Sequence, residues 1–142
     1  MVHVQHHEAP DSAVFATGTA NVETMEDVAP TDGEALVRKH LPGSFDGTDL
    51  DSVLAGMSTR SLVIGGFMTH MCCDTTAREA HARGFDVVFL TDGTATRDLT
   101  AASGKTIPHA IVHETTLAAQ ADGFSTLMDV ATVRAELMQH VA

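Results

Sequence analysis

The stretch from Ser61 to Gly84 constrains the fold most, because it predicts a buried strand that turns directly into a helix. Its first four residues, Ser61–Ile64, form a short apolar run with β-branched residues that stops at two adjacent glycines, as expected of a buried parallel strand. From about Cys72 the sequence is rich in Ala, Arg and Glu, with Asp74 in the first turn and Gly84 as a C-terminal stop. The pattern predicts a helix from about Cys72 to Arg83, with the Cys72 thiol at its N-terminus.

Strand and helix patterns alternate along the rest of the chain. Four further strands are predicted over Val2–His6, Ala35–Arg38, Asp86–Leu90 and Phe124–Met128. Further helices are predicted after a Thr48 cap, over Ile107–Asp122, and after a Thr132 cap with Val133, Leu137 and Val141 on a buried stripe. The polar segment from Glu8 to Gly33 predicts a long loop with a helical turn near Glu23–Val28. Such alternation is typical of an α/β domain with a parallel sheet, and 142 residues favour one domain over 1–142.

Composition excludes several classes of partner. The chain carries 19 acidic and 8 basic side chains, for a net charge of −11, which argues against nucleic acid and anionic membranes as partners. No apolar segment approaches the roughly 20 residues that a membrane-spanning helix needs. Two adjacent cysteines make no disulfide framework, and the N-terminus lacks a basic region followed by an apolar one, so we expect a cytoplasmic location.

Position alone leaves two interpretations of Cys72 equally open. The unpaired N–H groups and partial positive charge of a helix N-terminus favour a thiolate over a thiol, and the same N–H groups can hold an oxyanion. Alternatively, Cys72 and Cys73 are two small apolar residues packed under a sheet. A metal site built from His70, Cys72, Cys73 and His81 is disfavoured because no C-x-x-C pair exists.

A long ordered motif adds a family resemblance. The sequence GGFMTHMCCDTTAREA at 65–80, followed by GFDVV at 84–88 and TDGTATRD at 91–98, resembles the isochorismatase-like cysteine hydrolases. Upstream, EALVRK at 34–39 and the loop after it are similar to the family's lysine strand, and residues 113–130 resemble its late helix and last strand. The resemblance implies a Rossmann-like three-layer α/β/α fold with a mainly parallel sheet.

The resemblance also assigns roles at the motif. Cys72, directly after Thr-His-Met, becomes the catalytic nucleophile, and Lys39 becomes the triad lysine whose charge favours the thiolate. It implies a cis peptide bond between Phe67 and Met68, with the backbone N–H groups of Met68 and Cys72 forming the oxyanion hole. Cys73 is then a core residue. Without the resemblance, Lys39 would be interpreted as a lysine that reaches from a strand end to water.

Several other side chains are candidates for the pocket or for its support. Four are assigned to substrate binding, namely Phe45, Phe67, Thr69 and His70, although Phe45 also suits ordinary core packing and a polar residue before a helix is as easily a cap. We expect Asp92 and His113 to be structural, the latter as a core histidine with satisfied hydrogen bonds.

No cofactor is expected. Some nicotinamidase-like relatives bind a metal through an Asp-x-His pair, which is missing after the first predicted strand, so we predict no metal despite His3, His6 and His7. A small-molecule substrate is expected, and the resemblance implies a homo-oligomer.

The family normally begins with an apolar strand that ends in the catalytic aspartate and lies at the centre of the sheet. Here the first predicted strand matches the family's second, and no residue matches that aspartate. We therefore expect an N-terminally truncated fold that lacks the central strand, with impaired turnover. The resemblance predicts cleavage of a C–N bond in a small amide or imide through a Cys72 thioester. Two alternatives are an inactive remnant that serves as a structural subunit and, less favoured, a thiol redox or metal-binding module.

Overall fold

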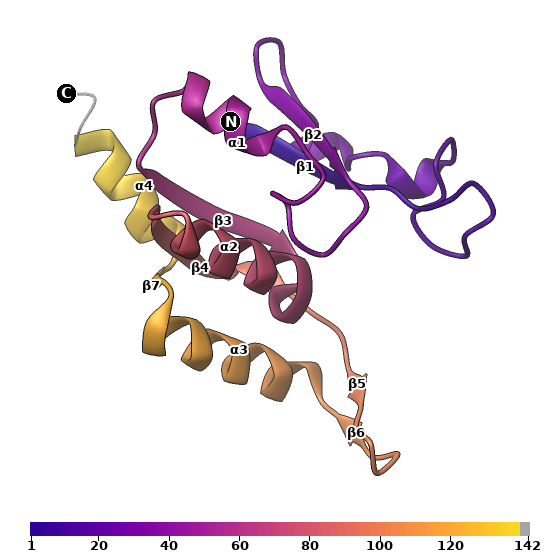
Figure 1. Ribbon diagram of the computed structural model, residues 1–142. Coiled ribbons are helices and arrows are strands. Elements are labelled where there is room, and N and C mark those ends of the chain that lie inside the picture. The colour runs from indigo at the N-terminus through magenta and orange to yellow at the C-terminus, as the bar shows by residue number, and fades with distance from the viewer. Residues whose placement is uncertain (140–142) are drawn as a thin grey trace. The chain divides into compact units, whose positions relative to one another are not determined.

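A computed structural model of the chain describes residues 1–139, and the chain divides into two compact units. The first unit comprises residues 1–59 and the second begins at Arg60 (Figure 1). Both contain parallel strands connected to helices, so the mainly parallel α/β fold is confirmed. The prediction of one domain over residues 1–142, and that of a missing central strand, stay predictions.

The first unit is built on two parallel strands, β1 (Val2–His6) and β2 (Ala35–Lys39). Their register places His6 opposite Lys39, so both side chains lie at the carboxyl ends of their strands. The loop between the strands contains two short 3-10 turns, at Ala20–Val22 and Glu26–Val28, where the sequence predicted one. Two strand ends of the first unit therefore place a histidine beside a lysine.

Helix α1 (Leu50–Gly56) follows β2 in the same unit. The Thr48 hydroxyl accepts a hydrogen bond from the Leu50 N–H at 3.2 Å, which confirms the predicted cap. Leu50 and Leu54 are both buried. They are four residues apart, a spacing that places two side chains on the same face of a helix. The buried apolar residues of this unit are Ala16, Val22, Val37, Phe45, Leu50 and Leu54.

The second unit contains a parallel sheet in the order β3–β4–β7, made of β3 (Ser61–Phe67), β4 (Asp86–Ala95) and β7 (Thr126–Met128). Helices α2 (Asp74–Ala82) and α3 (His109–Gly123) connect these strands, contact each other and pack on β4. A short antiparallel hairpin of β5 (Leu99–Thr100) and β6 (Thr106–Ile107) precedes α3, and α4 (Val130–Gln139) also contacts β4.

Strand β3 continues past the point where the sequence predicted its end. The two glycines lie inside the strand, at a register shift between Ile64 and Gly66. Gly66 has a φ of +125°, which side-chain-bearing residues rarely adopt, so glycine lets the strand bend there and keep pairing with β4. A Cβ atom on Gly65 would lie 3.0 Å from the Gly93 carbonyl oxygen. The glycines therefore allow close packing within the sheet instead of ending the strand.

Helices α3 and α4 also start at residues other than those predicted. Helix α3 starts at His109, because Ile107 pairs in the hairpin and the Asp98 carboxylate accepts a hydrogen bond from the His109 N–H at 2.7 Å. Asp129 caps α4 by accepting from the Thr132 N–H at 2.6 Å, so Thr132 is not the cap.

The predicted buried stripe of α4 is wrong for Leu137, which is exposed, and Val141 lies outside the described residues.

Asp92 has the structural role expected of it, because its carboxylate accepts a hydrogen bond from the Val130 N–H at 2.8 Å. Within residues 1–139, no helix combines the length and the apolar character that crossing a membrane requires.

Candidate active site

The turn after β3 carries the candidate nucleophile. The peptide bond between Phe67 and Met68 is cis, as predicted. The Met68 carbonyl then accepts hydrogen bonds from the N–H groups of Met71 at 3.0 Å and Cys73 at 3.3 Å, and residues Thr69–Cys73 form a π-helical turn. The helical segment therefore begins three residues before its predicted start, and Cys72 lies in this turn instead of opening an α-helix. Turns of this type occur frequently at functional sites.

The two cysteines lie in different surroundings. Cys72 is partly exposed, whereas Cys73 is only 5% exposed and lies against Gly66, where an added Cβ would be 4.0 Å from its sulfur. Both are thiols and not halves of a disulfide. The prediction of Cys73 as a core residue is confirmed, and Cys72 is the more exposed of the two residues.

Thr69 anchors the start of the turn through His113. Its hydroxyl lies 3.0 Å from His113 Nδ1, and His113 Nε2 lies 3.0 Å from the Thr91 carbonyl oxygen. A carbonyl only accepts, so Nε2 carries the hydrogen and a neutral ring accepts from Thr69 at Nδ1. His113 is thus the satisfied histidine that the sequence predicted. Because Thr69 is fully buried, its hydroxyl holds the turn against α3 and β4 instead of facing solvent.

His70 and Phe67 lie on either side of Thr69 in the turn and in β3. His70 is partly exposed, and its Nδ1 lies 2.6 Å from the Thr96 hydroxyl, which ties the turn to the segment after β4. Phe67 is 63% exposed, an unusual position for a large apolar side chain. Phe67 and His70 are therefore two residues near Cys72 in the sequence whose side chains are at least partly exposed to solvent.

A partly buried hydrogen-bond network supports the first turn of α2. Arg78 donates to both carboxylate oxygens of Asp74 at 3.0 Å, and Gln120 Nε2 donates to Asp74 Oδ1 at 2.7 Å. Ser125 donates to Gln120 Oε1 at 2.7 Å, and the Arg78 guanidinium lies 4.0 Å above the centre of the Phe124 ring. Gln120 is fully buried on α3. Sequence reasoning missed it, although a lone amide in an apolar helix signals a buried polar contact.

In the first unit, Lys39 is 4% exposed at the end of β2. Its Nζ donates to the carbonyl oxygens of Leu41 and Pro42, both at 2.7 Å, and lies 3.4 Å from His6 Nδ1. Lys39 thus differs from a lysine that reaches for water, because protein atoms surround its ammonium. Phe45 is 3% exposed and belongs to the core of this unit.

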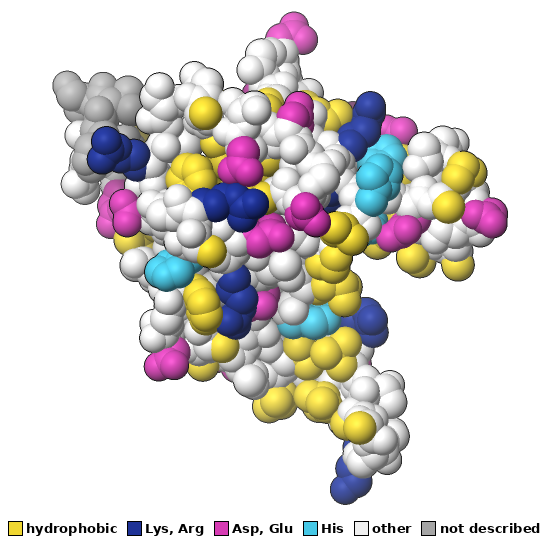
Figure 2. Space-filling model, viewed as in Figure 1, with side chains coloured by type: hydrophobic (Ala, Val, Ile, Leu, Met, Phe, Trp, Pro, Cys, Tyr) yellow, Lys and Arg dark blue, Asp and Glu magenta, His cyan; other side chains and the backbone are white. Residues whose placement is uncertain are grey.

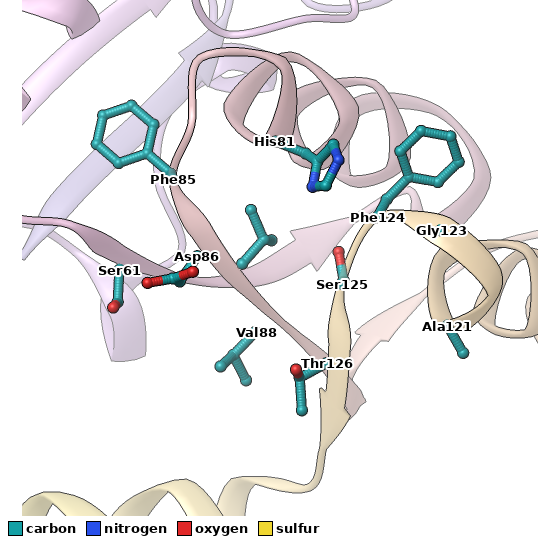
Figure 3. A pocket seen from close by; sticks show the side chains of 11 residues that line it. Ser61, His81, Phe85, Asp86, Val88, Ala121, Gly123, Phe124, Ser125 and Thr126 are labelled. Carbon is teal, nitrogen blue, oxygen red and sulfur yellow. The ribbon is translucent and has the colours of Figure 1, made fainter.

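A pocket of about 330 Å³ lies elsewhere in the second unit (Figure 3). Ser61, Asp86 and Thr126 mark its position at the amino ends of β3, β4 and β7, and His81 and Phe124 line its wall. Cys72 follows the carboxyl end of β3, so this pocket lies at the opposite edge of the sheet from the thiol. None of the residues predicted for the active site lines it.

Charged groups on the face shown in Figure 2 are mixed, with acidic and basic side chains interspersed over the region of α2. Among residues 1–139, no three His, Cys, Asp or Glu side chains lie close enough together to hold a metal ion. In the first unit, burial is the main cause that lowers the pKa of His7, and the nearby charges of Arg38 and His40 act in the same direction.

Comparisons with known proteins agree with this geometry. Residues 1–131 match the model of the isochorismatase domain. A secreted isochorismatase effector of Verticillium dahliae is 36% identical over 128 residues, which cover 90% of the chain and 65% of the relative. Nicotinamidase 3 of Arabidopsis thaliana is 33% identical over 127 residues, which cover 88% of the chain and 59% of the relative. The chain therefore spans roughly three fifths to two thirds of these relatives.

The chain is also similar to a crystal structure described as an isochorismatase hydrolase from Oleispira antarctica, with a TM-score of 0.90 and 35% sequence identity. The match covers 94% of this chain and 71% of the other.

Proposed function

Because the chain belongs to the isochorismatase family, we propose that it is a cysteine hydrolase that cleaves the C–N bond of a small amide or imide. One observation carries the proposal: Cys72 is a partly exposed cysteine in a hydrogen-bonded turn at the carboxyl end of β3, while Cys73 beside it is buried. Ligand sites in parallel sheets lie at this edge. The similarity to a nicotinamidase favours an amide as the substrate class.

The proposed reaction has two stages. The Cys72 thiolate attacks the carbonyl carbon, forms a C–S bond and places a negative charge on the carbonyl oxygen. The C–N bond then breaks, the nitrogen takes from solvent the proton that the thiol gave up and leaves as ammonia, an amine or an amide, and a thioester remains. Water next attacks the thioester, which releases a carboxylic acid and restores the thiol. The N–H groups of Met68 and Cys72 are proposed to stabilise the oxyanion in both stages.

Other residues have supporting roles in this proposal. We assign Lys39 to stabilise the thiolate of Cys72 electrostatically. Phe67 and His70 are proposed to contact the substrate directly. Thr69 acts through the turn that it anchors, and Phe45 through the core that supports Lys39. A cytoplasmic location and a homo-oligomeric state belong to the same proposal, and cell fractionation and sedimentation would test them.

The test uses the full chain with a panel of small primary amides and cyclic imides, nicotinamide included, and measures release of ammonia or ring opening. We expect hydrolysis that falls by at least about 1,000-fold in Cys72→Ser, because the hydroxyl is a far weaker nucleophile than a thiolate. The matched control is Cys73→Ser, which changes the neighbouring buried thiol.

Equal hydrolysis by Cys72→Ser and the unchanged chain would refute the nucleophile. If the unchanged, folded chain hydrolyses none of the panel, the result would favour a structural role for the chain.

A further inference from the structure

We propose that His6 positions Lys39, and that Glu8 fixes the imidazole of His6 in the tautomer that this role requires. The inference rests on the function proposed above, because it concerns the lysine of the same site. Strands β1 and β2 run parallel, and their register places His6 directly opposite Lys39. Neighbouring strand ends of the first unit thus hold the two side chains together.

The hydrogen bonds of Lys39 account for its whole ammonium group. An ammonium has three N–H donors, and three acceptors lie around it: the carbonyl oxygens of Leu41 and Pro42 at 2.7 Å, and His6 Nδ1 at 3.4 Å. The side chain is nearly inaccessible to solvent, so protein atoms must replace water. His6 supplies the one side-chain acceptor of the three.

The contacts on either side of the His6 ring define its tautomer. Because an ammonium only donates, Nδ1 of His6 must be the acceptor and Nε2 must carry the hydrogen. That Nε2 lies 2.7 Å from Glu8 Oε1, a carboxylate that accepts the hydrogen bond. A second proton on the ring would set an N–H against the Lys39 ammonium. The Phe15 ring, with its centroid 5.3 Å away, packs beside the imidazole.

This arrangement has a consequence for the lysine. The contact with His6 is the longest of the three, so it is the one that another acceptor displaces most easily. Lys39 can therefore release one N–H while the two backbone carbonyls still hold the ammonium in place. His6 thus keeps the Lys39 ammonium oriented until another acceptor takes its third N–H.

The first experiment measures the tautomer in the full-length chain by ¹⁵N NMR of the histidine rings, with the His6 signals assigned from a His6→Asn variant. We expect His6 to carry its hydrogen on Nε2 at neutral pH, and we expect Glu8→Ala, which removes the carboxylate that accepts this hydrogen, to weaken the preference. His3, whose Nε2 lies 2.9 Å from Glu34 Oε2, belongs to the same unit and should be unchanged, so it reports that this unit is folded in the variant. A His6 ring with hydrogen on Nδ1, or identical His6 signals in Glu8→Ala, would overturn the proposal.

The second experiment compares His6→Asn with His6→Leu in amide hydrolysis. Asn offers an oxygen close to the position of Nδ1, whereas Leu offers no acceptor. We expect kcat to fall about 10–100-fold in His6→Leu with KM changed less than about threefold, and to stay within about fivefold in His6→Asn. Equal losses in both variants would contradict the positioning role. The NMR result does not depend on hydrolysis, so it separates failure of this inference from failure of the proposed function.

Discussion

At the end of β3 the local backbone places the thiol of Cys72, whereas at the end of β2 an imidazole from the neighbouring strand joins two backbone carbonyls around the ammonium of Lys39. The Cys72 turn is defined by a cis bond, a glycine with positive φ and a carbonyl that accepts two hydrogen bonds. The environment of Lys39 consists of two backbone carbonyls and an imidazole that a carboxylate orients.

The difference explains which of the two sites the sequence describes better. A backbone-defined turn needs glycines and a fixed order of residues, which stand together in the chain as a motif. The environment of Lys39 also includes a side chain from a separate segment: Lys39 and His6 are 33 positions apart.

The largest expected effect separates the two adjacent thiols of the turn. We expect iodoacetamide to alkylate the thiol of Cys73→Ser, which retains Cys72, at least about 100-fold faster than the thiol of Cys72→Ser, which retains Cys73. A thiol that is 5% exposed reacts only after local opening, and an opening free energy near 3 kcal/mol already gives this ratio. Mass spectrometry over time measures both rates. In urea the rates should converge; similar rates in the native state would show that the turn does not distinguish its cysteines.

The next prediction asks how far side chains also support the Cys72 turn. Replacing the buried amide in Gln120→Leu removes the donor to Asp74 and the acceptor for Ser125, which should lower the free energy of unfolding by about 2–3 kcal/mol. Urea unfolding followed by circular dichroism measures the change. Thr115→Ala, at an exposed position on the same helix, is the matched control and should stay within about 0.5 kcal/mol. A loss no larger than the control's would mean that the backbone alone holds the turn.

Much of the fold follows from the sequence, because each element uses contacts among neighbouring residues. Val2–His6 forms the strand that its alternation predicts, and Thr48 caps α1 as expected. The errors arise where a distant residue intervenes. Asp98 caps α3 from eleven positions away, and Ile107 belongs to a hairpin that only the folded chain contains. Gly65 and Gly66 were predicted to end the strand, but they lie at a bulge within it. The local sequence pattern does not distinguish a bulge from a strand end.

In the candidate site, too, the local features were predicted from the sequence and the long-range contacts were missed. The motif predicted the cis bond and the buried character of Cys73, both of which are confirmed. Gln120 was missed because its partner Asp74 is 46 positions away, and the His6–Glu8 pair because a histidine after a strand looks like a surface residue. Long-range polar contacts thus limit what one sequence can predict.

Gly66→Ala tests the backbone device directly. A φ of +125° is strained for alanine, so we expect the free energy of unfolding to fall by about 1–2 kcal/mol, together with faster alkylation of Cys73 as the strand relaxes. Gly123→Ala is the matched control: Gly123 lies in α3 without a positive φ, and open space surrounds its Cα, so this change should be neutral or stabilise by up to about 1 kcal/mol. Thermal unfolding of both variants gives the comparison. Equal effects would show that Gly66 is not required for the turn.

The smallest effect concerns the amino ends of β1 and β2, where side-chain contacts again define the structure. The Thr31 backbone N–H, followed by His3, lowers the pKa of Glu34 from its ordinary value near 4.5 to about 2. A lowered pKa means that the folded state favours the carboxylate, so its stabilising contribution is complete above about pH 4.5 and disappears as the pH falls towards 2.

Glu34→Gln should therefore unfold at a slightly lower urea concentration than the unchanged chain at pH 7, and the difference should close between pH 4.5 and 2. Glu114→Gln, at an exposed position on α3, is the control and should show no such closing difference. A Glu34→Gln difference that persists unchanged at pH 2 would mean that the amide's shape, and not the lost charge, causes it. The amino ends of these strands would then depend on packing, unlike the hydrogen-bonded carboxyl ends that hold Lys39.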